Sequence, residues 1–225
     1  MNEIRVLVIG DFHTYHVPDQ RRFTEQFARR LRQTGRPVTV TCYTPFALSA
    51  VPPLLAQIPL HRYDLIVLQV GHNALQDVRE DGRKPLAQSS SNFINFLRGL
   101  TPGTLVRLRT IVRLGTVRQE LQAILNCLQP YRQNVVILTP FPHRESFSHW
   151  LRKQGQRLLI RAGKRGNMQI LDVYRLIKPR EEYFLSGDSA HLNASSHELI
   201  GAHLYELYAQ RTSTSWKHSF PPNSF

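Results

Sequence analysis

Two apolar runs, each ending in a glycine followed by polar residues, constrain the fold of this chain more than any other feature. The first runs from Ile4 to Ile9 before Gly10, and the second ends at Val70 before Gly71. Short, predominantly apolar runs of this kind are typical of strands buried on both faces, as in a parallel sheet covered by helices. Because ligands bind at the carboxyl ends of such strands, the polar residues that follow predict a functional site at one edge of the sheet.

Strand and helix patterns alternate along the rest of the chain. We expect strands at 4–9, 38–43, 64–70, 134–139 and 168–173, and helices at 19–34, 116–128, 146–162 and from about 195 onward. Pro45 to Pro59 is interpreted as a loop with about one helical turn, and Ser195 with Glu198 predicts a capping box for the last helix. This alternation predicts one α/β domain with a doubly wound sheet.

A basic stretch interrupts this alternation. No acidic residue occurs between Asp81 and Glu120, and arginines alternate there with Leu, Ile and Val. A basic insertion at about 81–118 is suited to a lid over an acyl or anionic substrate, a membrane-surface element or a dimer contact. An amphipathic helix hairpin covering the sheet is the simpler structural alternative. We expect one domain over 1–211 and a flexible tail at 212–225.

The formal net charge is +13, which creates a field that attracts phosphate, carboxylate or nucleic acid. The arginines are spread along the chain without the interleaved aromatic residues of a single-strand binding platform. Most of them are therefore expected on solvated faces. A small ester or an anion is the favoured ligand, and nucleic acid is not the favoured partner.

Cysteine and histidine spacing predicts neither a metal site nor a cofactor. Cys42 and Cys127 lack ligand spacing and are expected to be free, buried thiols. No paired ligand spacing links the histidines that follow predicted strands, His13, His16, His72 and His143. The first strand leaves no room for a signal peptide, and no apolar run reaches the roughly 18 residues of a spanning helix. We therefore expect a cytoplasmic protein without a transmembrane segment.

The loop before the last predicted helix carries the clearest chemical signal. It reads Ser186-Gly187-Asp188-Ser189-Ala190-His191-Leu192-Asn193. A carboxylate three residues before a histidine can accept a hydrogen bond from the imidazole and fix its tautomer, so that the other ring nitrogen acts as a base. A purely structural pair that ties the loop together would have the same spacing.

Taken together, Gly10-Asp11, Gly71-His72-Asn73 and Asp188-x-x-His191 resemble the motifs of the SGNH, or GDSL, hydrolases, in the same order and from Arg5 to about Leu207. The resemblance implies a flavodoxin-like three-layer α/β/α sandwich with a central parallel five-stranded sheet. It also implies an esterase or acyltransferase activity that needs no cofactor. By the same resemblance, His191 is the base, Asp188 orients it, and Asn73 helps to form the oxyanion hole.

Two marks of that family are absent from this sequence. The family's serine nucleophile follows Gly-Asp, and this chain has Phe12 there, whose side chain has no group that can attack a carbonyl. The family's oxyanion glycine follows the second strand, where the sequence Tyr43-Thr44-Pro45-Phe46-Ala47 contains no glycine. The expected fold is unaffected by these departures, whereas the usual covalent mechanism is not available. We expect Phe12 to fill part of the space where a family member holds the acyl carbon.

Three functions therefore stay open. The protein is a ligand-binding pseudoenzyme, or an enzyme in which Asp188 and His191 activate water or a substrate hydroxyl, or a basic binder of anions or nucleic acid. Asp11, His13 or Ser189 could also take a covalent role. In each case we expect the ligand to be lined by residues at the strand ends, namely Gly10, Asp11, His13, Gly71, His72 and His143.

Overall fold

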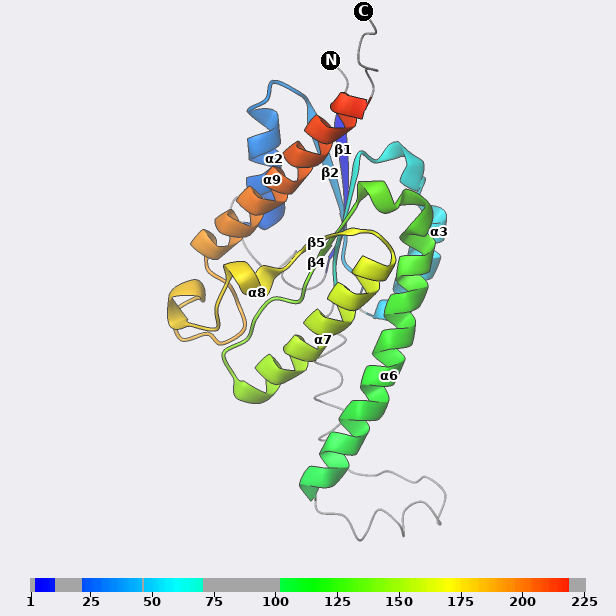
Figure 1. The fold of residues 1–225 in the computed structure, drawn as a ribbon. Helices are drawn as coiled ribbons and strands as arrows, with labels where there is room; N and C mark the ends of the chain where they lie inside the picture. Colours follow the sequence, from blue (N-terminus) through cyan, green and yellow to red (C-terminus); the bar gives the residue numbers. More distant parts are fainter. Residues whose placement is uncertain (1–2, 11–21, 46, 71–101, 219–225) are drawn as a thin grey trace, which may run out of the picture.

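The computed structural model describes residues 3–10, 22–45, 47–70 and 102–218, with side chains in the last range described over 114–212. All five predicted strands are present: β1 (Ile4–Ile9), β2 (Val38–Tyr43), β3 (Leu65–Gln69), β4 (Val135–Leu138) and β5 (Gln169–Leu171). They pair in parallel in the order β2-β1-β3-β4-β5 (Figure 1).

The chain adds β2 on one side of β1 and then β3, β4 and β5 on the other side, so the topological switch point lies between β1 and β3. Ile9, the last residue of β1, pairs with Leu68 on one side and with Tyr43 on the other, so the strands end together at one edge. Crevices at such a switch point are where doubly wound sheets bind ligands. The predicted flavodoxin-like α/β/α sandwich is confirmed.

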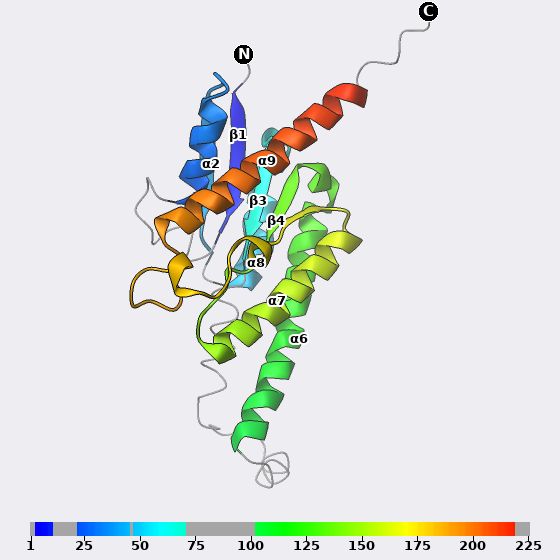
Figure 2. The same cartoon turned by 60° about the vertical axis from the view of Figure 1, so that its left-hand side comes forward.

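One face of the sheet is covered by α2 (Phe23–Arg32) and α9 (Ala194–His218), which lie side by side (Figure 2). The spacing of Phe23, Phe27 and Leu31 turns one face of α2 into the core, where they meet Val6 and Val8. The two helices approach closely at Gly201, where a Cβ atom would lie 2.7 Å from Gln26 Cβ and 2.9 Å from the Phe23 carbonyl oxygen.

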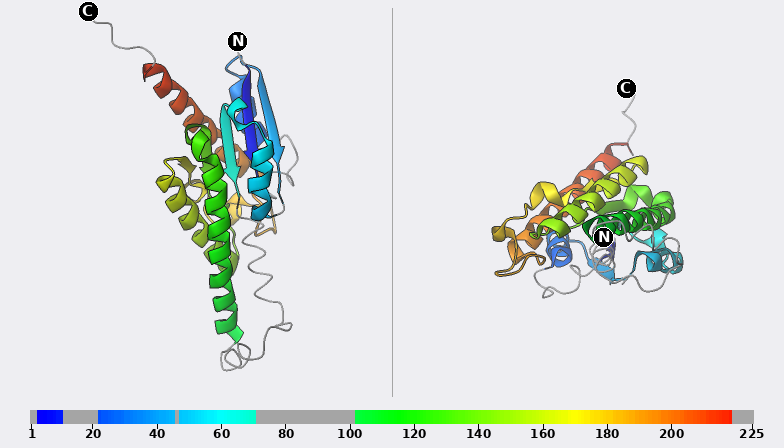
Figure 3. Two further views of the ribbon diagram at one scale, coloured as in Figure 1. Left: turned by 90° about the vertical axis from the view of Figure 1, so that its right-hand side faces the viewer. Right: turned by 90° about the horizontal axis from the view of Figure 1, so that it is seen from below.

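The opposite face is covered by α3 (Val51–Gln57), α6 (Pro102–Leu128) and α7 (Ser146–Arg165). Leu7 and Ile9 of β1 point into this second core. Because alternate residues of β1 reach opposite cores, the strand is apolar at every position except the exposed Arg5, which is why its sequence is a nearly continuous apolar run. The amino-terminal end of α6 extends past the carboxyl ends of the strands (Figures 1 and 3).

Short elements complete the connections between the layers. They are η2 (Leu48–Ala50), η3 (Leu60–Arg62), η4 (Gln129–Asn134), α8 (Val173–Leu176) and η5 (Glu181–Tyr183). The segment predicted as a loop from Pro45 to Pro59 contains η2 and the two turns of α3, more helix than expected. Two prolines follow Val51 in the first turn of α3, where a missing backbone N–H costs no helical hydrogen bond.

Two helices are longer than the sequence predicts. Residues 102–118 of the basic insertion are the start of α6 and continue without a break into the helix predicted at 116–128. The rest of the insertion lies outside the described residues. Helix α9 runs to His218, so the predicted tail from Thr212 begins inside a helix.

The predicted capping box at Ser195 is wrong. The helix begins one residue earlier, and the side-chain oxygen of Asn193 accepts a hydrogen bond from the backbone N–H of Ser196 at 3.0 Å. Asparagine is among the best N-cap residues because its short side chain reaches the free amides of the first turn. Glu198 instead lies 3.8 Å from Arg29 and 3.7 Å from Arg30 on α2.

Two further predictions concern burial and the membrane. Cys42 and Cys127 are free thiols, as expected, but both are exposed rather than buried. Neither lies on a strand or helix position that faces a core. In the part of the chain that the structure describes, no helix has the length and apolar character needed to cross a bilayer.

Candidate active site

The loop that carries Asp188 and His191 is held at its base by backbone pairing. Phe184 and Leu192 form an antiparallel bridge, and both side chains are buried in the core beneath α2 and α9. The backbone N–H of Leu185 donates to the His191 carbonyl at 3.0 Å. Gly187, at φ 74°, makes the tight turn between them, a conformation that costs glycine little. The loop is thus a short closed hairpin.

The Asp188 carboxylate is fixed by three hydrogen bonds. One oxygen accepts from the backbone N–H groups of Ala190 and His191 at 2.6 and 3.0 Å, and the other lies 2.5 Å from His191 Nδ1. Desolvation raises the pKa of Asp188, but these hydrogen bonds outweigh it and bring the pKa below its ordinary value. The carboxylate therefore stays ionised at neutral pH.

The pairing of Asp188 with His191 determines which ring nitrogen can act as a base. Nδ1 donates its proton to the carboxylate, so Nε2 is the nitrogen that can accept a proton from a reacting group. The two side chains are 31% and 30% exposed, so a solvent molecule or a ligand can reach them. The contact predicted from the three-residue spacing forms in the structure, while its catalytic role stays a prediction.

A second loop, which follows β4, braces the first. The backbone N–H of Arg144 donates to the Ser189 carbonyl at 2.9 Å, and Arg144 Nη1 donates to the Asp188 carbonyl at 3.3 Å. His143, predicted to bind substrate, lies on this loop; it is buried, and its Nδ1 accepts from the Glu145 N–H at 3.0 Å. This brings His143 to the loop beside Asp188, but its role in binding stays a prediction.

The start of α9 holds the loop from the other side. Asn193 donates through Nδ2 to the Glu182 carbonyl at 2.7 Å, and Ser196 donates through Oγ to the Tyr183 carbonyl at 2.8 Å. Asn193 thus caps α9 and ties it to η5 at the same time. His191, two residues before the cap, is positioned by a helix packed firmly on α2.

The ends of β1 and β3 complete the same edge of the sheet. Gly10 is buried, and its N–H donates to the Tyr43 carbonyl at 2.8 Å, so this amide is used in the sheet. The other predicted site residues lie outside the described residues, and their placement stays a prediction: Asp11, Phe12, His13, Gly71, His72 and Asn73.

Sequence reasoning missed a polar network at the ends of β4 and β5. Asp172 accepts hydrogen bonds from Gln156 at 2.7 Å and from Thr139 at 3.3 Å, and Thr139 Oγ1 in turn accepts from the Val173 N–H at 2.9 Å. Asp172 directly follows an apolar strand and caps α8, which is the one sequence signal that could have found it. The network fixes the strand ends from which the Arg144 loop departs.

Metal binding has no support within the described residues, where no group of three or more His, Cys, Asp or Glu side chains is placed to hold an ion. Three of the four histidines considered above, His13, His16 and His72, lie outside that part of the chain.

Comparison with known proteins gives structural relatives but no sequence relatives. No protein-family model and no curated protein matches this chain. An acetyl xylan esterase from Geobacillus stearothermophilus has a TM-score of 0.64 at 12% identity, over 91% of this chain and 94% of that one. A member of the lipolytic G-D-S-L family from Veillonella parvula has a TM-score of 0.60 at 12% identity, over 92% and 99% of the two chains.

A psychrotrophic esterase from a Pseudoalteromonas species matches with a TM-score of 0.56 at 12% identity, over 93% of this chain and 98% of that one. Each match spans nearly the whole of both chains, so the likeness concerns the complete domain and not one βαβ unit. The chain has the fold of the SGNH, or GDSL, hydrolases.

Proposed function

We propose that this SGNH-fold protein binds acyl esters at the carboxyl edge of its sheet and cleaves or transfers the acyl group slowly, with His191 as the general base. The observation that supports this is the Asp188–His191 pair, in which the carboxylate is fixed by two backbone amides and lies 2.5 Å from Nδ1. A loop that only needed closing would not require an ionised carboxylate aimed at a ring nitrogen. Positioned bases of this kind contribute about 10²- to 10⁴-fold to rates.

The proposed reaction has no acyl-enzyme intermediate. His191 Nε2 takes a proton from water, or from a substrate hydroxyl, while that oxygen attacks the ester carbonyl carbon. The tetrahedral intermediate then collapses, the bond to the alkoxy oxygen breaks, and the imidazolium returns the proton to the leaving alcohol. Asp188 holds the ring in the required tautomer and stabilises the imidazolium.

The negative charge that develops on the ester carbonyl oxygen also needs a hydrogen-bond donor. The Gly10 amide already donates to Tyr43 in the sheet. By resemblance, the Asn73 side chain is the donor we propose instead. With Phe12 in place of the family's serine, we propose that ligand binding is retained while covalent catalysis is lost, which makes the protein an impaired relative of ester hydrolases.

The test is hydrolysis of p-nitrophenyl esters of increasing chain length by the purified protein and a set of variants. His191→Ala should abolish turnover, while His203→Ala, a half-buried histidine on α9, should leave it unchanged. Ser189→Ala checks the alternative in which that exposed serine forms a covalent intermediate. Hydrolysis that survives His191→Ala contradicts the proposal.

Phe12→Ser, compared with Phe12→Ala, separates a new nucleophile from newly opened space. If the parent protein is inactive and only Phe12→Ser hydrolyses esters, the site binds esters without turning them over, and the protein is a ligand-binding pseudoenzyme. If no variant hydrolyses any ester, the site does not serve acyl chemistry.

A further inference from the structure

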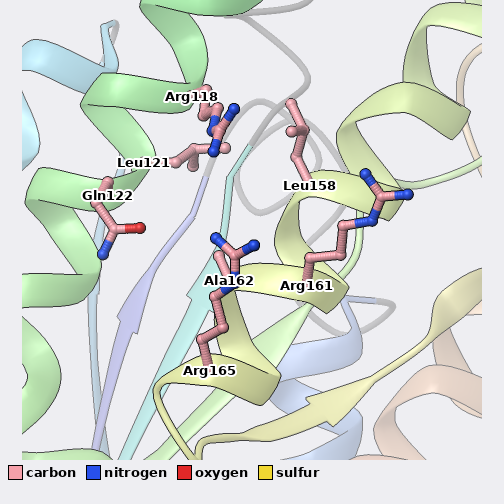
Figure 4. Close-up of a pocket in the computed structure, with 7 residues that line it drawn as sticks. All are labelled: Arg118, Leu121, Gln122, Leu158, Arg161, Ala162 and Arg165. Carbon is pink, nitrogen blue, oxygen red and sulfur yellow. The ribbon is translucent and has the colours of Figure 1, made fainter.

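A hollow between α6 and α7 lies outside the candidate active site. Its volume is about 90 Å³, and it is lined by Arg118, Leu121, Gln122, Leu158, Arg161, Ala162 and Arg165 (Figure 4). None of these residues belongs to the loops that carry Asp188, His191 or His143. A volume of this size holds several water molecules, and therefore has room for one phosphate group.

Three arginines from two helices line this hollow. Arg165 extends from α7 toward Arg118 on α6, whereas Arg161, one turn before Arg165, directs its guanidinium group away from these two (Figure 4). Like charges four residues apart on one helix repel each other, and Arg118 adds a third positive charge from across the gap.

No acidic side chain lines the hollow to balance that charge. Within the described residues, none of the three arginines forms an ion pair. Elsewhere on the surface arginines do have acidic partners, as Arg32 has in Glu25 at 2.7 Å and Arg144 has in Glu181 at 3.4 Å. The hollow therefore combines several arginines with no acidic side chain in its lining.

The apolar floor of the hollow strengthens the positive electrostatic field of the arginines. Leu121 is buried, and Leu158 and Ala162 are half-buried beside it, so one side of the charge cluster is apolar. Charges next to a low-dielectric wall interact more strongly with an anion than charges surrounded by water. Gln122 donates through Nε2 to Asn126 at 2.9 Å, which leaves its side-chain oxygen as an acceptor for a ligand hydroxyl.

We propose that this hollow binds the phosphate group of a small phosphate monoester, held between Arg118 and Arg165 with Arg161 beside it. Guanidinium groups match phosphate oxygens in pairs, and a dianion balances the facing charges of Arg118 and Arg165 better than a carboxylate does. The ester's organic part would rest on Leu121 and Leu158. This site is independent of the proposed acyl chemistry.

The experiment is calorimetric titration of the full chain with glycerol 3-phosphate and with inorganic phosphate, at a constant ionic strength of about 0.15 M, with acetate as the anion control. Arg118→Gln and Arg165→Gln should each weaken phosphate binding by about tenfold. Arg157→Gln is the matched control, because it removes one exposed arginine from α7 outside the hollow and should leave the affinity unchanged. Circular dichroism verifies that each variant is folded.

A second arm identifies the source of the phosphate. Phosphatidylcholine vesicles with and without phosphatidic acid are sedimented with the parent and with Arg165→Gln. Binding of glycerol 3-phosphate alone supports a soluble ligand, and Arg165-dependent binding to acidic vesicles supports a lipid headgroup. The proposal is overturned if no phosphate probe binds the parent, or if Arg157→Gln weakens binding as much as Arg165→Gln does.

Discussion

The two faces of the sheet are covered by helix pairs that pack in opposite ways. On one face, α2 and α9 approach so closely at Gly201 that a single added carbon would lie 2.7 Å from Gln26 Cβ. On the other face, α6 and α7 leave a hollow of about 90 Å³ lined by three arginines. At Gly115 on α6, an added carbon would meet no atom within 4 Å.

The tightly packed helices α2 and α9 suit a site that needs fixed geometry, and the more loosely packed α6 and α7 suit a site that needs accessible charge. The close pair carries the Asp188–His191 loop, because Asn193 caps α9 and the loop ends at Phe184 and Leu192 are buried in the same core. A base must be held in one orientation to transfer a proton, so it benefits from a tight layer. An anion site needs only converging positive charge and an open approach, which the looser pair of helices provides.

The largest expected effect concerns the loop on the close side. Asp188→Asn keeps the size of the side chain but removes the charge that holds His191 Nδ1, and should lower any ester turnover by about 10²-fold or more. The measurement is kcat/KM on the best p-nitrophenyl ester, with Glu182→Gln, an exposed carboxylate nearby, as the control. Equal losses in both variants would contradict the role given to Asp188.

The second prediction concerns pH and the core under the close pair. His197 is fully buried, stacked on Phe23 and edge-on to Phe141, and neither ring nitrogen has a hydrogen-bond partner among the described residues. Desolvation lowers the pKa of His197 to about 4. Between pH 6.5 and 4 the unfolded chain binds a proton there that the folded chain does not, so the free energy of unfolding should fall by up to about 3 kcal/mol as pH decreases.

Urea unfolding at several pH values measures this contribution. His197→Leu should remove this part of the acid destabilisation, while His203→Leu on the same helix should retain it. An unchanged pH dependence in His197→Leu would show that other groups cause it.

A third prediction tests the close approach directly. Gly201→Ala places a carbon 2.9 Å from the Phe23 carbonyl oxygen, so the two helices must separate, and unfolding free energy should drop by about 1–3 kcal/mol. Thermal and urea denaturation measure the change. Because α9 positions His191, ester turnover should fall in the same variant even below its melting temperature.

The smallest effect should have the opposite sign. Gly115→Ala on α6 meets no neighbouring atom, and alanine is the better helix former, so unfolding free energy should rise by about 0.5–1 kcal/mol. If Gly115→Ala destabilises the protein as much as Gly201→Ala does, position 115 is not open as described. Gly115→Ala should also leave phosphate binding at the hollow unchanged.

The fold was largely predictable because its signals are local. The central strands β1, β3 and β4 are mainly apolar runs, and the edge strand β2 alternates, so these strands could be located from the sequence. Residues 102–118 were harder to place, because arginines alternate with apolar residues there. That they form one helix with residues 119–128 could not be inferred from this local pattern. The exposure of Cys42 was missed because β2 is an edge strand, which depends on strand order and not on residue type.

In the candidate site, only the part encoded within a few residues could be predicted. The Asp188–His191 contact follows from a spacing of three residues on one turn. By contrast, Arg144 meets the Asp188 carbonyl across 44 positions, and Thr139 meets Asp172 across 33. No local pattern records such pairs, since the sheet brings them together only after β4 and β5 have paired.

The anchoring of the Asp188–His191 loop by α9 has a consequence for synthesis on the ribosome. Strands β1 to β5 emerge first, yet the face covered by α2 and α9 keeps an open apolar groove until residues 194–218 have left the exit tunnel. Until then, a nascent chain exposes this apolar face of the sheet, a surface of the kind that chaperones for unfolded chains bind. The loop that carries His191 is therefore anchored only when α9 completes the core on this face.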